Sequence, residues 1–318
     1  MKKLLSLLLA VMLVLTFAMP VMAEEDEEVI VAYLAKNTVD AFHATMNNKA
    51  AEILDSMVEE GLVDDWQLYD ATTDPILQVS CLQDAITNGS NYFLLQPCEA
   101  AGSDPVVTQC VEQGYPIVVI NSYTNSTMEL ATGYAFSDDL DAGHMMGDFV
   151  ISQIPEGGKY AHMMGVVGSS AQILRGQGIQ EKLNEESGWE CVGDYAAEWL
   201  AEKAVSFAAD VITQYGEELR AIVCDNDDMS SAVQAYCNSI GREDIVCIGV
   251  DGNRGPLTMV KEGTLRATVF QDGEGQVEYA INTILRALIT GETEGVDMKV
   301  GNVPFILVTA ENVDEYLK

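Results

Sequence analysis

Polar side chains stand directly after several short apolar segments of this 318-residue sequence, where they could bind a small molecule. At the ends of these segments lie Gln96, Asn121, Asn226, Asp251 and Gln271. Their amides and carboxylates offer both hydrogen-bond donors and acceptors, and every sugar hydroxyl uses both. The set therefore indicates a site for a polyhydroxylated ligand.

Two aromatic residues, an arginine and a further aspartate extend this set. Asp40 and Phe42 follow the first apolar segment, and Arg175 and Trp199 follow segments in the second half of the chain. Aromatic faces stack on the C–H faces of sugars. An arginine can donate to a ring oxygen, and a carboxylate can accept from two adjacent hydroxyls. Together these residue types favour carbohydrate binding.

Two of the strand-end residues also have a structural interpretation. Asp251 and Gly252 could form a turn. Asn226 could cap a helix that starts near Met229. The prediction therefore depends on the whole set and not on a single member.

The aromatic and arginine residues are open to the same objection. Trp199 and Phe42 could be core aromatics, which is the usual fate of such residues. Arg175 could pair with Glu181 or another acidic neighbour on a solvated face.

The elements that must position these residues alternate between strand and helix. Apolar segments with the composition of buried strands occupy 29–35, 92–96, 116–121, 159–165, 220–225, 244–251 and 266–271. Helical periodicity fills the intervals, and in 272–290 one face carries Val277, Ile281, Ile284, Leu285 and Leu288. This alternation predicts an α/β protein with parallel sheets buried on both faces. The strands are too many for one compact lobe, so we expect two doubly wound lobes, with the less regular segment 122–138 crossing between them.

The charge balance excludes several classes of partner. The chain has 16 Lys and Arg against 50 Asp and Glu, a formal charge of −34. Such a charge repels phosphate backbones and anionic lipids, so we expect neither nucleic-acid nor membrane-surface binding. Apolar residues make up 48% of the chain, which is typical of a globular protein and not of a disordered acidic one.

Cysteine and histidine usage predicts neither a metal site nor a cofactor. The chain has seven cysteines and three histidines, and no CxxC pair or His/Cys cluster at ligand spacing. No EF-hand-like loop occurs either. We expect mostly free, structural cysteines, with one surface pair left open.

The first 23 residues have the pattern of an export signal. Lys2 and Lys3 precede an apolar run of 14 residues, 4–17, and a small-x-small sequence ends at Ala23. That run is too short to span a bilayer comfortably. We expect cleavage after Ala23 and release of a soluble protein that begins at Glu24, in the periplasm or outside the cell.

Four segments carry a resemblance to a known family. The most specific are AIVCDNDDMSSAVQAYCNSIGREDIVCIGVDGNRG (221–255) and VKEGTLRATVFQ (260–271), and 168–183 and 32–46 match in spacing. From Val29 to Gly291 the chain resembles the type I periplasmic sugar-binding proteins, the ribose/galactose group that feeds ABC importers.

The resemblance implies ligand roles in the second half of the chain. Arg175 resembles the arginine that clamps the sugar ring oxygen and nearby hydroxyls. Asn226 and Asp251 resemble the asparagine and aspartate that bind hydroxyls. Gln271 stands where the family has Gln or Asn, just before a crossing between lobes.

The remaining ligand positions implied by the resemblance include an aromatic pair. Trp199 and Phe42 resemble the rings that sandwich the sugar, while Asp40 and Asn121 match galactose/glucose binders. The weaker candidates are His43, Gln96 and Ser137.

Four positions depart from the family pattern and disfavour ribose. Ser122 replaces an arginine, and His43 replaces a second aromatic residue next to Phe42. Lys36 replaces a small residue, and Ala171 stands where galactose binders supply a carboxylate. We therefore expect a neutral hexose, such as galactose or glucose, or a related polyol. The calcium loop of galactose/glucose binders is not recognisable.

The resemblance also implies three hinge crossings, near 137–138, 271–272 and 301–304. The N-terminal lobe would contain 29–137 plus 272–300, and the C-terminal lobe 138–271 plus 301–318. Ligand binding between the lobes would close the hinge.

The expected function is that of a monomeric, non-enzymatic sugar receptor. The closed complex would dock on a membrane ABC permease. The alternative is a sensory protein that presents a sugar-like signal molecule or polyol to a membrane receptor. A glycosidase would need two carboxylates flanking the bond, for which Asp40 and Asp251 would be the candidates.

Overall fold

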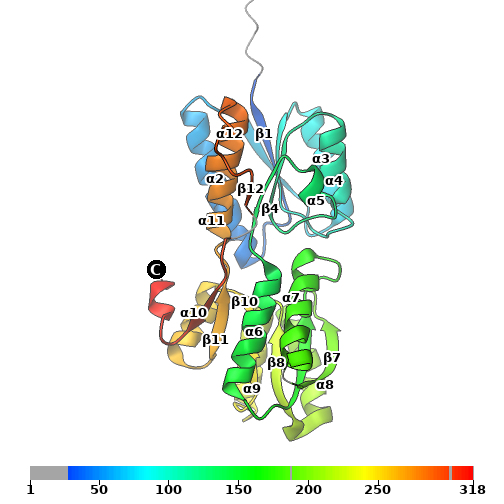
Figure 1. Cartoon of the computed structure of the whole chain (residues 1–318), viewed down its shortest axis with the longest axis vertical. Helices are drawn as coiled ribbons and strands as arrows, with labels where there is room; N and C mark the ends of the chain where they lie inside the picture. The colour runs from blue at the N-terminus through cyan, green and yellow to red at the C-terminus, as the bar shows by residue number, and fades with distance from the viewer. Residues whose placement is uncertain (1–27, 187, 301–302, 318) are drawn as a thin grey trace, which may run out of the picture.

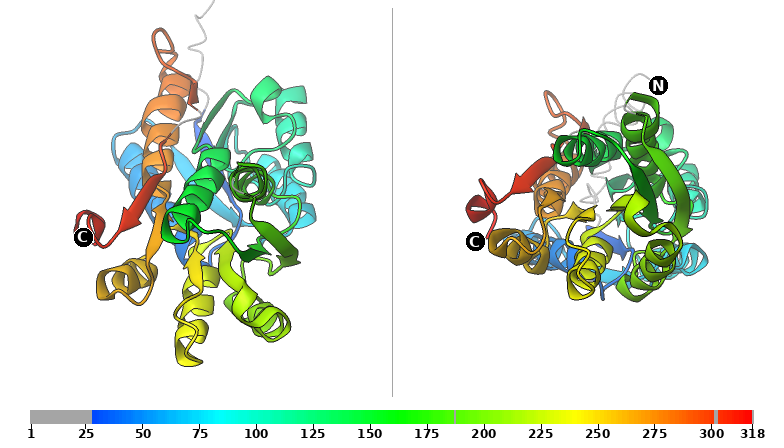
Figure 2. Two further views of the ribbon diagram at one scale, coloured as in Figure 1. Left: turned by 60° about the horizontal axis from the view of Figure 1, so that its bottom comes forward. Right: turned by 90° about the horizontal axis from the view of Figure 1, so that it is seen from below.

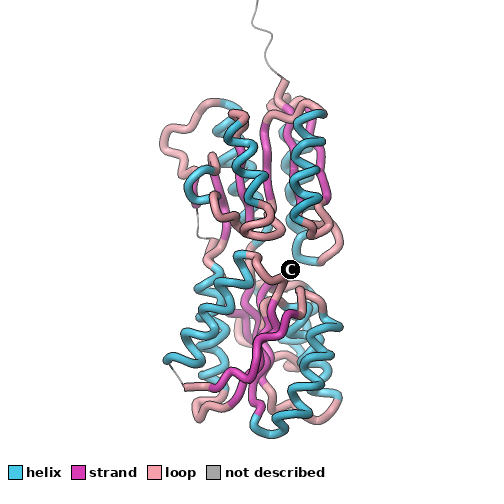
Figure 3. Tube along the Cα trace, turned by 90° about the vertical axis from the view of Figure 1, so that its right-hand side faces the viewer, coloured by secondary structure: helices cyan, strands magenta, loops and turns pink. Residues whose placement is uncertain are grey.

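Two separate groups of strands form the centres of two α/β lobes (Figure 1). The computed structural model describes residues 28–186, 188–300 and 303–317. The expected export signal, residues 1–23, lies outside this part of the chain. The lobes follow one another along the long axis of the molecule, and in each lobe helices flank the central strands (Figure 3). The predicted architecture of two doubly wound α/β lobes is confirmed.

The first lobe, here the N-terminal lobe, contains a six-stranded sheet in the order β12-β5-β4-β3-β1-β2, with all neighbours parallel. Its strands are β1 (Ile30–Ala35), β2 (Asp65–Asp70), β3 (Tyr92–Leu95), β4 (Ile117–Asn121), β5 (Gly133–Phe136) and β12 (Lys299–Val300). Its helices are α2 (Ala41–Glu59), α3 (Pro75–Thr87), α4 (Asp104–Glu112), α5 (Thr127–Leu130), α11 (Gly273–Glu278), the π-helical turn η3 (Tyr279–Leu285) and α12 (Arg286–Thr290).

The C-terminal lobe contains two smaller groups of strands, in the orders β7-β6-β8-β9 and β10-β11-β13. The strands are β6 (Lys159–Met164), β7 (Glu190–Ala196), β8 (Leu219–Cys224), β9 (Val246–Ile248), β10 (Val250–Asp251), β11 (Ala267–Phe270) and β13 (Ile306–Thr309). The helices are α6 (Asp139–Gln153), α7 (Ser170–Gln180), α8 (Ala201–Tyr215), α9 (Asp227–Ser239) and α10 (Arg254–Glu262). Three short turns complete it: η1 (Glu181–Glu186), η2 (Gly216–Glu218) and η4 (Val313–Glu315). Seen from below, the helices surround the strands (Figure 2).

Burial on both faces of each sheet explains why the central strands read as continuous apolar segments. Alternate residues of β1 enter different cores: Val31 and Tyr33 pack with α2 and α11, whereas Ala32 and Leu34 pack with α3 and α4. The strands β6 and β8 divide their side chains between two further cores in the same way. Such strands are typical of parallel sheets covered by helices on both sides.

The predicted helix over 272–290 is confirmed and completes the N-terminal lobe. Val277, Ile281, Ile284 and Leu285 are buried in the same core as β1 and α2, and Leu288 packs against it. In Figure 1 the α11–α12 segment lies beside α2, although more than 200 residues separate them in the sequence. Residues from near the C-terminus therefore cover one face of the first sheet.

Several strands were not predicted because they are not continuously apolar. In β2 only Tyr69 is buried, and β7 has no buried residue, because both lie at sheet edges. The segment 122–138, expected to be a crossover, contains β5 of the N-terminal lobe, and the chain leaves that lobe only after it. The strand β13 runs antiparallel to β11, so the C-terminal lobe departs from a fully parallel arrangement.

The chain passes between the lobes after β5, after β11 and between β12 and β13. The last passage includes 301–302, which the structure does not describe. The exact lobe boundaries, after 137, 271 and 300, stay predictions.

All seven cysteines carry free thiols, and six of them are buried. In the part of the chain that the structure describes, no helix is both long and apolar enough to cross a membrane.

Candidate ligand-binding cleft

A cavity of about 410 Å³ lies between the lobes and is lined by side chains from both. This volume suits a small molecule. All eight residues predicted as the main ligand contacts line it: Asp40, Phe42, Asn121, Arg175, Trp199, Asn226, Asp251 and Gln271. The weaker candidate His43 lines it too.

Gln96 and Ser137, the other two weaker candidates, are absent from the cavity lining. The side chain of Gln96 accepts from the backbone N–H of Lys36 at 3.4 Å and donates to the sulfur of Met46 at 3.6 Å. The Ser137 hydroxyl accepts from Gln276 Nε2 at 2.7 Å. Both are almost fully buried behind the cavity, where they support the backbone around it.

The ends of the parallel strands bring the predicted residues together. Asn121 is the last residue of β4, Asp251 is the last residue of β10, and Gln271 directly follows β11. Asn226 follows β8, and Asp40 follows β1. The carboxyl ends of strands in doubly wound sheets are where ligands usually bind, because the connecting loops leave a crevice there. The carboxyl ends of the strands in the N-terminal lobe therefore border the cavity from one lobe, and those in the C-terminal lobe border it from the other.

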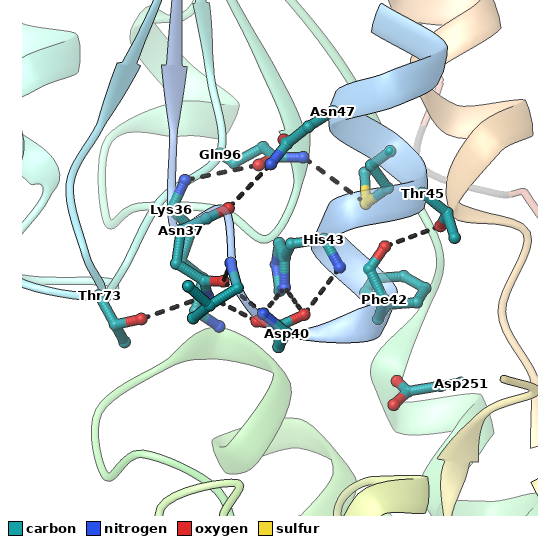
Figure 4. A network of polar contacts seen from close by, with 12 residues as sticks. Lys36, Asn37, Asp40, Phe42, His43, Thr45, Asn47, Thr73, Gln96 and Asp251 are labelled. Carbon is teal, nitrogen blue, oxygen red and sulfur yellow. Dashed lines mark hydrogen bonds and ion pairs between the residues drawn. The ribbon is translucent and has the colours of Figure 1, made fainter. Parts of the chain in front are cut away.

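Asp40 is held by donors from its own lobe at the start of α2 (Figure 4). Its carboxylate accepts from His43 N at 2.7 Å, His43 Nδ1 at 2.9 Å and Asn37 Nδ2 at 2.5 Å. Burial by itself raises the pKa of Asp40, but the adjacent ring and backbone N–H of His43 and the Asn37 amide hold it below its ordinary value. Asp40 is therefore a carboxylate at neutral pH.

His43 belongs to the same network. Burial, together with the nearby ammonium of Lys36, lowers the pKa of His43 below its ordinary value. The imidazole is therefore neutral at pH 7, and the Nδ1 contact makes Nδ1 the protonated nitrogen.

Arg175 is buried and fixed by three groups of the C-terminal lobe. Its guanidinium lies 2.8 Å from Asp139 Oδ1, donates from Nη1 to the carbonyl of Asp225 at 2.5 Å and donates from Nη2 to Gln271 Oε1 at 3.1 Å. The alternative pairing with Glu181 is wrong, because Glu181 contacts His144 instead. Two of the five N–H groups of Arg175 stay available for a ligand.

Close packing of α6 on α7 places Arg175 against Asp139. A Cβ on Gly143 of α6 would collide with the carbonyl oxygen of Arg175, and a Cβ on Gly178 of α7 would collide with that of Leu140. The two glycines therefore allow the backbones to approach closely enough for this buried ion pair.

Asn226 has both of the roles considered for it. Its Oδ1 caps α9 by accepting from the backbone N–H of Met229 at 3.1 Å, as the structural interpretation predicted. The residue lines the cavity as well. Because the cap uses only the oxygen, the amide N–H₂ remains for a ligand.

Asp251 presents a poorly satisfied carboxylate to the cavity. Its nearest donor is Asn253 Nδ2, at a long 3.4 Å. Burial, followed by the charge of Asp227, raises the pKa of Asp251 well above its ordinary value. Asp227 itself is satisfied by Thr268 and by the backbone N–H of Gly252. A ligand that donates hydrogen bonds would therefore stabilise the Asp251 carboxylate.

The two aromatic residues of the cavity come from different lobes, and glycines make room for both. Phe42, 8% exposed, packs in the core as well as lining the cavity. A Cβ on Gly273 would lie 2.9 Å from its ring. The Trp199 indole lies on Gly165, where a Cβ would collide with the ring. The core interpretation and the ligand interpretation of Phe42 are thus compatible.

Backbone strain is concentrated at this cavity. Among the described residues, the non-glycine positions with positive φ are Thr72, Thr73, Asn121, Glu198, Trp199 and Asp251. All but Thr72 line the cavity. Such conformations cost free energy and persist where the surrounding structure holds functional groups in place.

Three charged residues of the cavity, Lys36, Glu198 and Asp228, were not among the ligand contacts predicted from the sequence. The position of Lys36 directly after an apolar strand was a usable signal, because the other strand-end residues were selected on that ground. Asp228 belongs to the first turn of α9, in the same CDNDDMS segment as Asn226. Within the described ranges, no cluster of three or more His, Cys, Asp or Glu residues could hold a metal ion.

A family model, periplasmic binding protein domain, matches residues 31–293. The chain is 26% identical to a xylitol-binding protein of Mycolicibacterium smegmatis over 77% of this chain and 68% of that protein. It is 28% identical to the ribose import binding protein of Bacillus subtilis over 65% of this chain and 66% of that protein.

A solved structure has the same fold. An ABC transporter solute-binding protein from Bacillus halodurans with bound myo-inositol matches with a TM-score of 0.81 and 25% identity. The match covers 92% of this chain and 97% of that one.

Proposed function

This chain belongs to the periplasmic binding protein family, in its type I ribose/galactose group, and we propose that it is the extracytoplasmic substrate-binding protein of a sugar ABC importer. The observation that carries the proposal is the cavity between the lobes. It combines an arginine, amides, carboxylates and two aromatic residues, all expected for a polyhydroxylated ligand. Export with cleavage after Ala23 is part of the proposal.

The proposed ligand class is a monosaccharide or a cyclic polyol of similar size. The related proteins described above bind xylitol, ribose and myo-inositol according to their names, and these compounds share only a dense set of hydroxyls. A hexose such as galactose or glucose is favoured over ribose, because Ser122 stands in place of an arginine and His43 in place of a second aromatic ring. Both residues line the cavity, where these replacements would alter ligand contacts.

The proposed mechanism is hinge closure driven by the ligand. Asp40, Phe42 and Asn121 belong to the N-terminal lobe, and Arg175, Trp199 and Asp251 to the C-terminal lobe. A ligand that contacts both groups at once binds the closed form more tightly than the open form and increases its population. The closed form would then dock on a membrane permease. A membrane receptor that senses a sugar-like signal is the alternative partner, and both partners would use the same closed form.

A binding role suits the cleft better than glycoside hydrolysis. Hydrolysis needs one carboxyl group that gives up a proton and a second that acts as base or nucleophile. With its raised pKa, Asp251 would be the acid, which leaves Asp40 as base or nucleophile. The Asp40 oxygens are already occupied by donors from His43 and Asn37. We expect no turnover of glycosides by the purified protein.

The test is isothermal titration calorimetry and thermal shift of the protein from Glu24 onward against pentoses, hexoses, cyclitols and linear polyols. A binder should stabilise the fold by about 2.7 kcal/mol at 100 times its Kd. Saturable binding of one of these compounds with 1:1 stoichiometry supports the proposal. Absence of binding across the panel would overturn it.

A further inference from the structure

The cavity contains more negative than positive charge once its internal ion pairs are set aside. Arg175 is neutralised by Asp139, and Glu198 by Lys203 at the rim. This leaves the ammonium of Lys36 against three carboxylates, those of Asp40, Asp228 and Asp251.

The three carboxylates differ in how well the protein satisfies them. Asp40 is fully provided with donors by its own lobe. Asp251 has one distant donor, Asn253, and Asp228 has no hydrogen-bond donor among the described residues. The two incompletely satisfied carboxylates both belong to the C-terminal lobe and both line the cavity.

These carboxylates also repel one another across the cleft. Burial raises the pKa of Asp228, and the charge of Asp40 on the opposite lobe raises it further. The same Asp40, together with Asp227 and Asp228, contributes to the raised pKa of Asp251. Closure without a compensating charge therefore brings like charges together at low dielectric, which is unfavourable.

The positive charge of Lys36 compensates only part of the negative charge of the three carboxylates. Its ammonium, on a residue 5% exposed, forms no ion pair within 4.0 Å with any described residue and instead lies 5.2 Å from the centroid of the Trp199 ring. Burial lowers the pKa of Lys36, and the charges of Asp40 and Asp251 partly offset that effect. Asp228 has neither a hydrogen-bond donor nor an ion pair among the described residues.

Resting on the function proposed above, we infer that the ligand is a sugar or cyclic polyol that carries an ammonium group, bound by Asp228 and Asp251. The hydroxyls of the ligand are then bound by Arg175, Asn121, Asn226 and Gln271. A uronate or sugar phosphate is disfavoured, because it would place a further negative charge beside three carboxylates. The formal charge of the full sequence, −34, also attracts cations from solution and so favours a positively charged ligand.

Calorimetry with matched compounds tests this inference. The probes are glucose with glucosamine, N-acetylglucosamine and glucuronate, and the same four compounds of the galactose series. They are measured at pH 6.5 and low ionic strength, where the amines are protonated. In at least one series the free amine should bind ten times or more tightly than its neutral parent, N-acetylation should remove that gain, and the uronate should not bind.

Two variants locate the charge effect. Asp228→Asn should lower affinity for the amine about tenfold more than it lowers affinity for the neutral parent. Asp210→Asn, which removes the same charge from the exposed surface of α8, should leave the ratio of the two affinities unchanged.

The outcomes separate this inference from the function on which it rests. Binding of neutral sugars as tight as that of their amines, in both series, overturns the ammonium and leaves a sugar-binding protein. An equal loss of neutral and amino ligands in Asp228→Asn also overturns it. No binding of any compound in either series overturns both.

Discussion

The ammonium of Lys36 lies 5.2 Å from the centroid of the Trp199 ring, so that a cation of one lobe rests over an aromatic residue of the other. A cation over an indole contributes about 0.5–2 kcal/mol, depending on how far it is removed from water. This contact joins the two lobes directly at the cleft.

Replacing Lys36 should therefore favour the open form. Lys36→Met removes the cation–π contact and leaves three carboxylates without their counter-charge. We expect a larger radius of gyration by small-angle X-ray scattering in ligand-free solution. Lys261→Met, which removes an exposed lysine paired with Asp314, is the control. An unchanged radius in Lys36→Met would contradict the role of the contact.

Arg175 should contribute to stability as well as to binding. Arg175→Ala leaves the buried Asp139 without its partner, and breaking such a pair costs about 3–5 kcal/mol of unfolding free energy. The double variant Arg175→Ala/Asp139→Asn should recover most of the stability in urea unfolding but not the ligand affinity. Recovery of both would show that Arg175 does not contact the ligand.

Gly165 should control the position of Trp199. Gly165→Ala adds a Cβ where the indole now lies, and the ring must leave its present position in the cavity lining. We expect ligand affinity to fall by roughly 1–3 kcal/mol, the contribution of a stacked aromatic ring, in isothermal titration. Gly255→Ala is the matched control, because its Cβ meets nothing within 4 Å and its site lies on α10. Equal affinities in the two variants would contradict this account.

His162 should make stability fall as the pH rises above neutrality. It is 3% exposed and contacts Asp225 at 2.8 Å and Asp194 at 3.0 Å. Burial lowers its pKa, but these two carboxylates outweigh that effect and raise it to about 9. The folded protein therefore keeps a proton that the unfolded chain loses near pH 6.5. The resulting stabilisation, about 3 kcal/mol, is complete below pH 6.5 and disappears between pH 6.5 and 9.

Urea unfolding at pH 6, 7.5 and 9 measures this effect as the difference between the wild type and His162→Gln. The difference should shrink as the pH rises. A constant difference would mean that His162 has no proton to lose in this range. His144→Gln, at a half-buried contact with Glu181, provides the comparison.

The positions of most cleft residues could be predicted because they depend on local sequence. Asn121, Asp251 and Gln271 end or follow apolar strands, and the ends of parallel strands meet at one edge whatever the details of packing. The same logic fails for β2 and β7, since edge strands bury little and their sequences are mixed. The pattern of apolar residues in a sequence reveals buried strands, and β2 and β7 bury few of their side chains.

The partners of the cleft residues could not be predicted in this way. Arg175 pairs with Asp139, 36 positions earlier, because two glycines allow α6 and α7 to approach closely. Lys36 meets Trp199 only through the arrangement of the lobes. Such contacts are set by tertiary packing, and a single sequence gives no measure of it.

The α11–α12 segment, packed against α2 on the first sheet, determines the order in which the molecule can be completed. A chain that emerges from its N-terminus forms β1 to β5 early, but residues such as Val31 and Val118 are then covered on one face by α2 alone. The rest of their cover arrives only with residues 273–290, after almost the whole second lobe has emerged. The lobe that begins first is therefore finished late. During that interval its exposed apolar face is the surface that chaperones must protect from aggregation.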